Sequence, residues 1–401
     1  MSEQNFIDKL LDGVEVEWKA VGEVFDLKNG YTPSTSKKEF WEGGSIPWFR
    51  MDDIRVNGQI LDNSLQKISV SAVKGGKLFP ANSIIISTSA TIGEHALITV
   101  PYLANQRFTG LSLKEGYAET FDIKFIFYYC FLLTDWCKKN TTMSSFASVD
   151  MDGFKKFQIP IPCPDNPKKS LEIQAEIVRI LDTFTELTAE LTTELTTRKK
   201  QYHYYRDQLL SFEEGEVEWK TLGEVAENLD SKRKPITSNQ RDPGDIPYYG
   251  ASGIVDYVQD YIFDGDLLLV SEDGANLLAR NTPIAFSISG KSWVNNHAHV
   301  LKFETYAERR YVEYYLNSID LSPYISGAAQ PKLNKKNLES ISIPNPSFEE
   351  KKRIVAILDK FDTLTTSLTQ GLPREIELRQ QQYAYYRDLL LSFPKPESVE
   401  A

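Results

Sequence analysis

The chain has 401 residues, 41% of them hydrophobic, which is enough for two or more domains with cores of their own. Its formal net charge of -11 excludes a protein that coats nucleic acid nonspecifically, because Lys and Arg supply most of that affinity. Any contact with nucleic acid must therefore use local basic patches.

Signals for export, disulfides and metals are weak. No cationic stretch leads into an apolar run at the N-terminus, and no segment approaches about eighteen consecutive apolar residues, so we expect a soluble, cytoplasmic protein. Cys130, Cys137 and Cys163 lack the spacing of a zinc site and are expected to be free thiols. His297 and His299 are close in an expected strand, which is only a weak metal signal, so we predict no metal site.

Internal repeats decide the domain organisation. Several short strings recur in the same order, about 180 to 200 residues further along the chain. They are Glu-Val-Glu-Trp-Lys at 15–19 and 216–220, Gly-Glu-Val at 22–24 and 223–225, Ile-Val-x-Ile-Leu-Asp at 177–182 and 354–359, and Tyr-Tyr-Arg-Asp at 204–207 and 385–388. The chain is therefore predicted to be two copies of one unit.

The repeat is also cyclic. Residues 8–11, Asp-Lys-Leu-Leu, stand before the first copy and resemble residues 207–210, Asp-Gln-Leu-Leu, which stand before the second. Residues 1–14 are therefore predicted to be a helical tip whose preceding helix lies at the C-terminus. This arrangement is expected if the two copies close around a pseudo-twofold axis.

Two segments, residues 15–160 and 215–344, are rich in glycine, proline and aromatic residues. They contain short apolar runs such as 83–87 and 267–270, which indicate buried strands. We predict two α/β (α+β) domains with a strong strand component. Between their shared strings, these domains differ from each other far more than the helical segments do.

The first segment between them, residues 161–214, is predicted to be a long helix. Its apolar residues repeat in steps of three and four, which is typical of a coiled-coil seam over about residues 171–211. The seam runs through Ile177, Ile180, Phe184, Leu187, Leu191, Leu195, Tyr202, Tyr205, Leu209 and Phe212. The extra step of four from Leu191 to Leu195 is a stutter that locally unwinds a supercoil.

The second helical segment, residues 345–401, has a similar seam with an interruption. The seam runs through Ile354, Ile357, Phe361, Leu364 and Leu368, and then resumes at Ile376. Residues 371–373, Gly-Leu-Pro, predict a break, because proline is tolerated only in the first turn of a restarted helix. Two such helices packed antiparallel would form a stiff spacer roughly 60 Å long, at about 1.5 Å per residue.

The order of domain, helix, domain, helix, with its paired strings, resembles the specificity subunits of type I restriction-modification enzymes of the C subfamily. The resemblance covers the whole chain. Local strings in both domains are also similar to those of the family's target-recognition domains. They are residues 30–33, 45–48 and 105–106 in the first domain, and residues 245–248, 293–300 and 330–334 in the second.

The resemblance implies a non-catalytic DNA-recognition subunit. Each domain would read one half of a bipartite target in double-stranded DNA, and the helices would set the spacer between the halves. The helices would also dock two methyltransferase subunits and two restriction subunits. S-adenosylmethionine, ATP and Mg would be used by those partners, and no cofactor by this chain.

Residues 188–195, Thr-Ala-Glu-Leu-Thr-Thr-Glu-Leu, resemble a four-residue repeat of that subfamily's central helix. In the subfamily, the number of repeats is linked to the length of the unread spacer. One added unit lengthens a helix by about 6 Å and rotates the remainder of that helix by about 40°. Leu187, Leu191 and Leu195 are the predicted spacer residues; a plain coiled-coil segment with a stutter explains them equally, and both interpretations can hold.

Two strings resemble enzyme motifs. Residues 285–292 fit a relaxed phosphate-loop pattern, but that loop must open a helix, and here a strand pattern comes next. A hairpin turn at Gly290 and Lys291 is the preferred interpretation. Residues 345–348, Asn-Pro-Ser-Phe, resemble an adenine methyltransferase motif but lack its second proline, which favours a helix-entry turn. An autonomous methyltransferase or phosphate-loop ATPase is the alternative function, and a scaffold or DNA mimic is a third.

Direct readout of DNA needs Arg, Lys, Asn and Gln at base edges, and the same side chains contact phosphates. The predicted DNA-binding residues are Arg50, Arg55, Lys74, Lys77 and Arg107 in the first domain and Lys232, Arg233, Lys234, Arg241, Arg280, Lys291 and Lys332 in the second. A solvated charged face is the alternative for each. Asn105, Gln106, Asn295 and Asn296 are either base readers or buried hydrogen-bonding groups.

The repeated tyrosine and arginine residues near the helix ends are predicted to dock partner subunits. In the first copy these are Tyr205 and Arg206, and in the second they are Tyr386 and Arg387. Packing of the two helix ends against each other explains the same residues. No catalytic residue is predicted anywhere in the chain.

Overall fold

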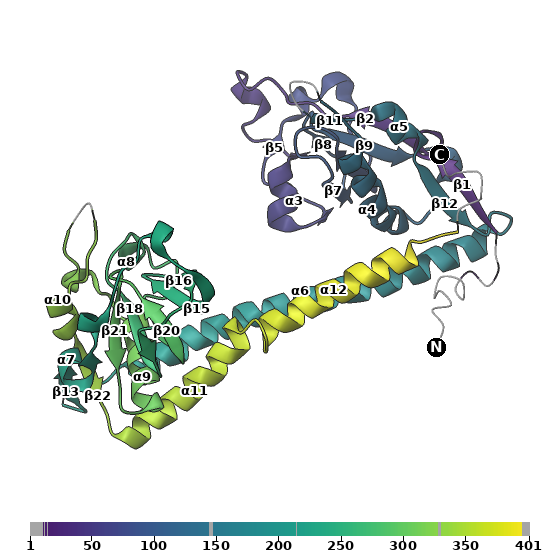
Figure 1. Ribbon diagram of the computed structural model, residues 1–401. Helices are drawn as coiled ribbons and strands as arrows, with labels where there is room; N and C mark the ends of the chain where they lie inside the picture. The colour runs from purple at the N-terminus through teal and green to yellow at the C-terminus, as the bar shows by residue number, and fades with distance from the viewer. Residues whose placement is uncertain are drawn as a thin grey trace. The chain divides into compact units, whose positions relative to one another are not determined.

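The chain divides into two compact units. The computed structural model describes residues 11, 13, 15–143, 147–213, 215–327 and 330–394, so the predicted tip at residues 1–14 lies almost wholly outside the described residues. The first unit consists of Met1–Ala189 with Leu378–Ala401, and the second of Glu190–Glu377. Each unit contains one mixed domain and parts of the long helices, as the repeat predicts (Figure 1).

The first unit holds a five-stranded sheet of order β2-β9-β6-β7-β4 and a three-stranded sheet of order β5-β3-β8. Their strands are β2 (Phe25–Asn29), β3 (Ile46–Phe49), β4 (Ile60–Leu61), β5 (Lys67–Ile68), β6 (Ser83–Ser87), β7 (His95–Ile98), β8 (Leu103–Ala104) and β9 (Phe108–Leu113). Two further antiparallel pairs are β1 (Val16–Ala20) with β12 (Gln158–Pro162), and β10 (Thr141–Met143) with β11 (Ala147–Val149).

Strand β6 lies between two apolar cores. Ile84 and Ile86 pack into the core that contains helix α4 (Ile123–Lys139), whereas Ile85 packs into a second core with Phe79. Successive side chains of a strand point to opposite faces, so a strand that is covered on both faces reads as a continuous apolar run. This explains why the sequence signal at residues 83–87 is strong.

The remaining helical segments of the first domain are short. They are α2 (Val21–Val24), α3 (Met51–Asn57) and α5 (Met151–Lys156), with 3-10 turns η1 (Lys38–Phe40), η2 (Val70–Ala72), η3 (Lys74–Gly76) and η4 (Glu115–Tyr117). Helix α4 begins after Asp122, whose Oδ1 accepts a hydrogen bond of 2.7 Å from the Lys124 amide. Such a cap satisfies a backbone N–H that has no partner within the helix.

The second unit repeats this plan, with sheets of order β14-β21-β18-β19 and β16-β15-β20-β17. Their strands are β14 (Glu227–Asn228), β15 (Pro243–Gly250), β16 (Gly253–Val258), β17 (Phe263–Asp264), β18 (Leu267–Ser271), β19 (Ala285–Ile288), β20 (Lys291–Val294) and β21 (Ala298–Lys302). Strand β13 (Glu218–Thr221) pairs with β22 (Ser342–Asn345), as β1 does with β12.

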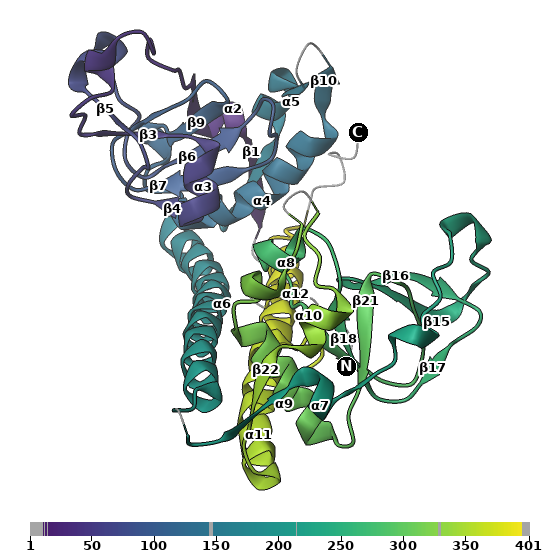
Figure 2. The same cartoon turned by 90° about the vertical axis from the view of Figure 1, so that its left-hand side faces the viewer.

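The second domain also buries its central strand on both faces. Leu268 and Val270 of β18 face the core with helix α9 (Tyr306–Ser318), and Leu269 faces the other core. Helix α9 packs against α11 (Phe348–Thr366) (Figure 2). The shorter helical segments are α7 (Leu222–Val225), α8 (Asn276–Ala279), α10 (Lys335–Glu339), η5 (Asp230–Lys232), η6 (Ser238–Gln240) and η7 (Ser322–Tyr324).

The predicted hairpin at Gly290 and Lys291 is wrong. Strand β19 pairs with β18, whereas β20 pairs with β15 and β17, so Gly290 lies in a crossover between two sheets. Its φ of 77° is in the region that glycine adopts without steric cost. The strand that begins at Lys291 is nevertheless present, and no helix opens there as a phosphate loop requires.

Helix α6 spans Pro167–Leu210, 44 residues, and begins a turn earlier than predicted. The predicted break is confirmed, since α11 ends at Thr366 and α12 (Leu372–Leu390) begins after Gly371. The seam prediction at Leu368 is wrong. This side chain is 78% exposed because the helix has already ended.

Within each unit, α6 pairs with one of the two shorter helices. In the first unit Phe184 stacks on Tyr386 of α12 at 5.3 Å between ring centroids, and in the second Tyr205 stacks on Phe361 of α11 at 5.7 Å. All four residues belong to the predicted seams or to the repeated tyrosine strings, so each contact joins α6 to a shorter helix through predicted packing residues. The core of the first unit also buries Leu11 and three apolar residues at and after the end of α12, namely Leu390, Leu391 and Phe393.

The three cysteines are free, as predicted. Cys130 and Cys137 are buried in α4, whereas Cys163 is only partly buried. Burial raises the pKa of the Cys130 thiol far above its usual range and that of Cys137 to about 12. Over the part of the chain that the structure describes, no helix combines the length and apolarity needed to cross a membrane.

Candidate nucleic-acid interface

Three separate strings of the first domain meet at the ends of β3 and β8. The indole Nε1 of Trp48 donates to the carbonyl of Tyr31 at 3.1 Å, and the Asn105 amide donates to the Phe49 carbonyl at 3.0 Å. Thr32 donates to the side chain of Gln106. Gly30 is required here, because a Cβ would overlap the carbonyl of Asn105. The strings at 30–33, 45–48 and 105–106 therefore form one surface.

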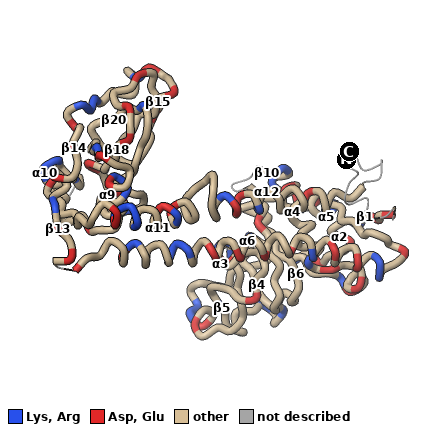
Figure 3. The backbone as a smooth tube through the Cα atoms, turned by 90° about the horizontal axis from the view of Figure 1, so that it is seen from below, with Lys and Arg blue, Asp and Glu red and all other residues tan. Residues whose placement is uncertain are grey.

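Four of the five predicted cations of the first domain are exposed, namely Arg55, Lys74, Lys77 and Arg107. The Lys74 amine lies 4.7 Å from the ring centroid of Tyr31, which places it at the surface just described. Positions of Lys and Arg alternate with positions of Asp and Glu along the backbone of both units (Figure 3). This pattern agrees with local rather than general attraction for a polyanion.

Arg50 is the fifth cation and is half-buried. Its guanidinium lies 5.6 Å from the Trp48 ring centroid and 3.8 Å from an oxygen of Asp52. Its Nε is buried and has no hydrogen-bond partner among the described residues. A buried donor without a partner is costly, so this arginine is suited to a ligand that supplies an acceptor.

The strings of the second domain also converge. Tyr248 of β15 is the register partner of Trp293 in β20, and the Asn295 amide donates to the Tyr249 carbonyl at 3.0 Å. The side-chain oxygens of Asn105 and Asn295 accept from the amide two residues further on, at 3.0 and 2.8 Å. These two asparagines therefore have matching roles in holding a turn.

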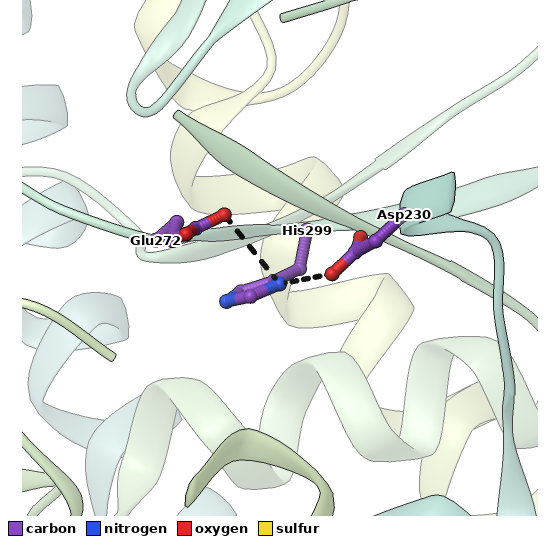
Figure 4. Close-up of side chains that lie close together, drawn as sticks. All are labelled: Asp230, Glu272 and His299. Atoms are coloured by element: carbon purple, nitrogen blue, oxygen red, sulfur yellow. Dashed lines mark hydrogen bonds and ion pairs between the residues drawn. The ribbon is translucent and has the colours of Figure 1, made fainter. Parts of the chain in front are cut away.

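Asp230, Glu272 and His299 form a buried polar cluster in the second domain (Figure 4). His299 Nδ1 lies 2.6 Å from Asp230 Oδ2 and 3.8 Å from Glu272 Oε2. Its Nε2 lies 2.7 Å from the carbonyl oxygen of Leu333. Both ring nitrogens therefore lie within hydrogen-bond distance of oxygen acceptors.

The two carboxylates of this cluster are also paired with Arg233 and Lys332. Arg233 lies 2.6 Å from Glu272 and 3.3 Å from Asp230, and the Lys332 amine lies 3.1 Å from Glu272. Burial alone raises the pKa of Asp230, but the hydrogen bond and charge of His299 outweigh it and hold that pKa below its usual range. A metal ion would have to displace these cations, so the cluster does not fit a metal site.

Sequence reasoning missed Asp230 and Glu272 because they lie far apart in the chain. In the sequence, only the position of Asp230 close to the basic run at 232–234 suggests that an ion pair forms there. The cluster connects β21, the residue after β18 and the segment at 332–333, because it binds the Leu333 carbonyl and the Lys332 amine. In the first domain, Thr109 of β9 occupies the place that His299 of β21 has in the second. The group there is neutral, because Thr109 bonds to Thr88 at 2.9 Å and to Asn29 at 3.0 Å.

The other predicted cations of the second domain divide into two groups. Arg233, with a side chain 13% exposed, Arg241 and Arg280 are bound internally. Arg241 pairs with Asp256 at 2.9 Å, and Arg280 donates to the carbonyl of Ile319 at 2.5 Å. Exposed amines are those of Lys232, Lys234 and Lys291, the last lying 4.6 Å from the Tyr261 ring centroid.

Exposed apolar residues of the second domain were also missed. Ile254, Val255 and Tyr257 of the edge strand β16 are all about half exposed. The register between β15 and β16 shifts at Tyr248 and Tyr249, so the strand bulges at this point. No alternation of apolar and polar residues marks β16, and for that reason nothing in the sequence indicates this surface.

The predicted docking residues are partly used in helix packing. Tyr205 and Tyr386 stack on the paired helix, and the side chains of Arg206 and Arg387 are only 16% and 17% exposed, each bound to the next residue, an aspartate. Tyr204 and Tyr385 are more exposed, at 61% and 60%, than Tyr205 and Tyr386, at 46% and 40%. The two copies therefore present the same tyrosine and aspartate to solvent.

The chain contains two domains with the same plan. Each domain is attached to paired helices and has cations near converging strings of sequence. These features define a binding protein built from two similar halves. The family model described as type I restriction modification DNA specificity domain matches residues 13–198 and 214–378. The chain belongs to this family.

Curated relatives span nearly the whole chain. The type I restriction enzyme EcoprrI specificity subunit of Escherichia coli is 57% identical over 92% of this chain and 93% of its own length. The EcoR124I/EcoR124II specificity subunit of the same species is 37% identical over 100% of both chains.

Two solved structures share the fold. A type I restriction-modification S subunit from M. genitalium has a TM-score of 0.56 at 16% identity, over 96% of this chain and 98% of that one. A chain from a structure concerned with the assembly and conformational transition of the type I system has a TM-score of 0.63 at 16% identity, over 94% and 97%.

Proposed function

We propose that this chain is the non-catalytic, sequence-reading subunit of a type I restriction-modification complex. Each domain reads one half of a bipartite DNA target, and the helices set the spacer. The observation that supports this function best is the duplication. Both domains bring separate strings together around a tryptophan, whose indole N–H donates to the carbonyl of Tyr31 in the first domain and of Lys234 in the second. The exposed residues Lys74 and Lys234 lie at these two places.

The partners are part of the same proposal. Two methyltransferase subunits use S-adenosylmethionine to methylate adenines, and two restriction subunits use ATP and Mg. A methylated base must be flipped out of the duplex, so a separate chain that grips both sides of the target is useful. Tyr204 and Tyr385, exposed to the same degree in the two copies, support docking of one kind of partner twice.

The function is tested by mapping methylated adenines in cells that carry the complete system. The expected result is one motif with two specific halves and a gap of fixed length. Exchange of the first domain, residues 15–160, for that of another specificity subunit should change one half only. A single uninterrupted motif, or no motif at all, would refute the proposal.

The competing function is an autonomous methyltransferase or ATPase. The strand that begins at Lys291 and the capped helix start at Ser347, whose hydroxyl accepts from the Glu350 amide, both speak against it. Calorimetry of the isolated chain with S-adenosylmethionine and with ATP should give no heat of binding. Saturable binding of either compound would favour the competing function.

A further inference from the structure

The aspartate that ends each repeated Ile-Leu-Asp string contacts the adjacent domain in the same way in both units. In the first unit, Asp182 of α6 is 2.7 Å from the Lys124 amine and 2.7 Å from the Tyr128 hydroxyl, both in α4. In the second unit, Asp359 of α11 is 3.0 Å from Arg310 and 2.7 Å from the Tyr314 hydroxyl, both in α9.

The donors of each cluster have the same spacing. The cation and the tyrosine are four residues apart in α4 and again in α9, so they lie on one face of the helix. The cation is lysine in one copy and arginine in the other. The contact is therefore retained although its chemical form differs and the two domains otherwise diverge.

These donors belong to helices that pack on the central sheets. Helix α4 contacts β6 and β7, and helix α9 contacts β18 and β19. Tyr128 and Tyr314 are buried. Burial, together with the hydrogen bond to Asp182, raises the pKa of Tyr128 well above its usual range, so its hydroxyl stays protonated and donates.

The second cluster is larger. Tyr306 donates to Asp359 at 2.8 Å, and Arg310 also pairs with Asp362 at 3.0 Å and with Glu313 at 2.5 Å. Ser287 of β19 donates to Glu313. A chain of polar contacts thus runs from a strand of the recognition domain to the long helix.

We propose that these clusters, Lys124-Tyr128-Asp182 and Arg310-Tyr314-Asp359, are latches that fix the angle of each recognition domain on its helix and so make the spacer length strict. Apolar packing is non-directional, whereas hydrogen bonds to a carboxylate are short and directional. A domain without its latch keeps its reading surface but can pivot. The inference rests on the proposed function, since it concerns how two half-sites are held at one separation.

The test uses the full chain assembled with its methyltransferase subunit. Methylation rates are measured on duplexes whose two half-sites are separated by the native gap or by one base pair more or fewer. The double variant Tyr128→Phe with Tyr314→Phe removes only the hydroxyl groups. The preference for the native gap is expected to fall about tenfold, because each variant loses a hydrogen bond to a charged group, and both half-sites stay required.

Matched variants separate a latch from general damage. Lys124→Arg copies the second cluster and should keep strict spacing, whereas Lys124→Met should not. Glu176→Gln and Glu350→Gln, which remove the exposed pairs with Arg179 and Arg353 on the same helices, should leave the preference unchanged. If the double variant does not assemble, Tyr128→Phe alone gives the measurement, since the second latch is intact.

Failure of the latch proposal and failure of the proposed function would give different results. Strict spacing in every latch variant, with half-site recognition intact, would overturn the latch and leave the proposed function standing. A wild-type complex that methylates without any preference for one gap would overturn the proposed function itself.

Discussion

Neighbouring cations in the sequence have different roles in the structure. Lys232 and Lys234 are exposed, whereas Arg233 between them pairs with Asp230 and Glu272. A guanidinium held by two buried carboxylates cannot also contact a phosphate without leaving one of them unpaired. We therefore expect Lys232 and Lys234, rather than Arg233, to contact DNA.

Lys291→Ala should weaken DNA binding by the assembled complex by a similar factor on all sequences. The amine lies over Tyr261 and is exposed, so it can contact a phosphate but carries no base information. The slope of log affinity against log salt should become shallower by about one unit. Lys352→Ala on α11 is the control; equal slopes for wild type and Lys291→Ala would contradict this role.

His95 should make the first unit sensitive to acid. It is buried against Phe127 and Phe131, and burial lowers its pKa from 6.5 to about 4. Between these values the unfolded chain binds a proton that the folded chain does not, so stability is full above pH 6.5 and falls as the pH drops toward 4. The loss is about 3 kcal/mol.

Denaturant unfolding of wild type and His95→Phe between pH 7 and 4 measures this effect. The variant lacks the titrating group, so its unfolding free energy should fall less steeply over that range. Its absolute stability at pH 7 is not the readout. Parallel curves for the two proteins would show that another group is responsible.

Gly371, between helices α11 and α12, has a φ of 80°, and a Cβ there would overlap the carbonyl oxygen of Thr363. Gly371→Ala should therefore destabilise the second unit by more than about 1 kcal/mol, measured by thermal unfolding. Gly215→Ala is a matched control, because its φ is 86° and nothing lies within 4 Å of the added carbon. Equal losses for both would mean that the contact with Thr363 is relieved easily.

Long periodic elements were predictable from the sequence, and pairing between strands was not. The run at 83–87 and the interruption at 371–373 have local causes, burial on both faces and an impossible helix geometry, so they are visible without coordinates. The assignment of β19 and β20 to different sheets depends on register with distant strands. For the same reason, the sequence could not predict that Asp230, Glu272 and His299 form one cluster.

The length of helix α6 is expected to set the length of the gap between the two halves of the DNA target. Inserting one Thr-Ala-Glu-Leu unit after Leu195 adds about 6 Å and about 40° of rotation to α6. Methylation mapping should then return the same two halves with a longer gap. Leu195→Ala, which shortens no helix, is the control. An unchanged gap would remove the role of α6 as a ruler.

The different burial of the thiols makes the protein convenient to label. Cys130 and Cys137 are enclosed in α4, with thiolates disfavoured by burial, so alkylating reagents should reach only Cys163, at the entry to α6. A dye attached there without any substitution would sit where the first recognition domain joins its helix. Fluorescence polarisation from that one position could then follow partner and DNA binding in the natural sequence.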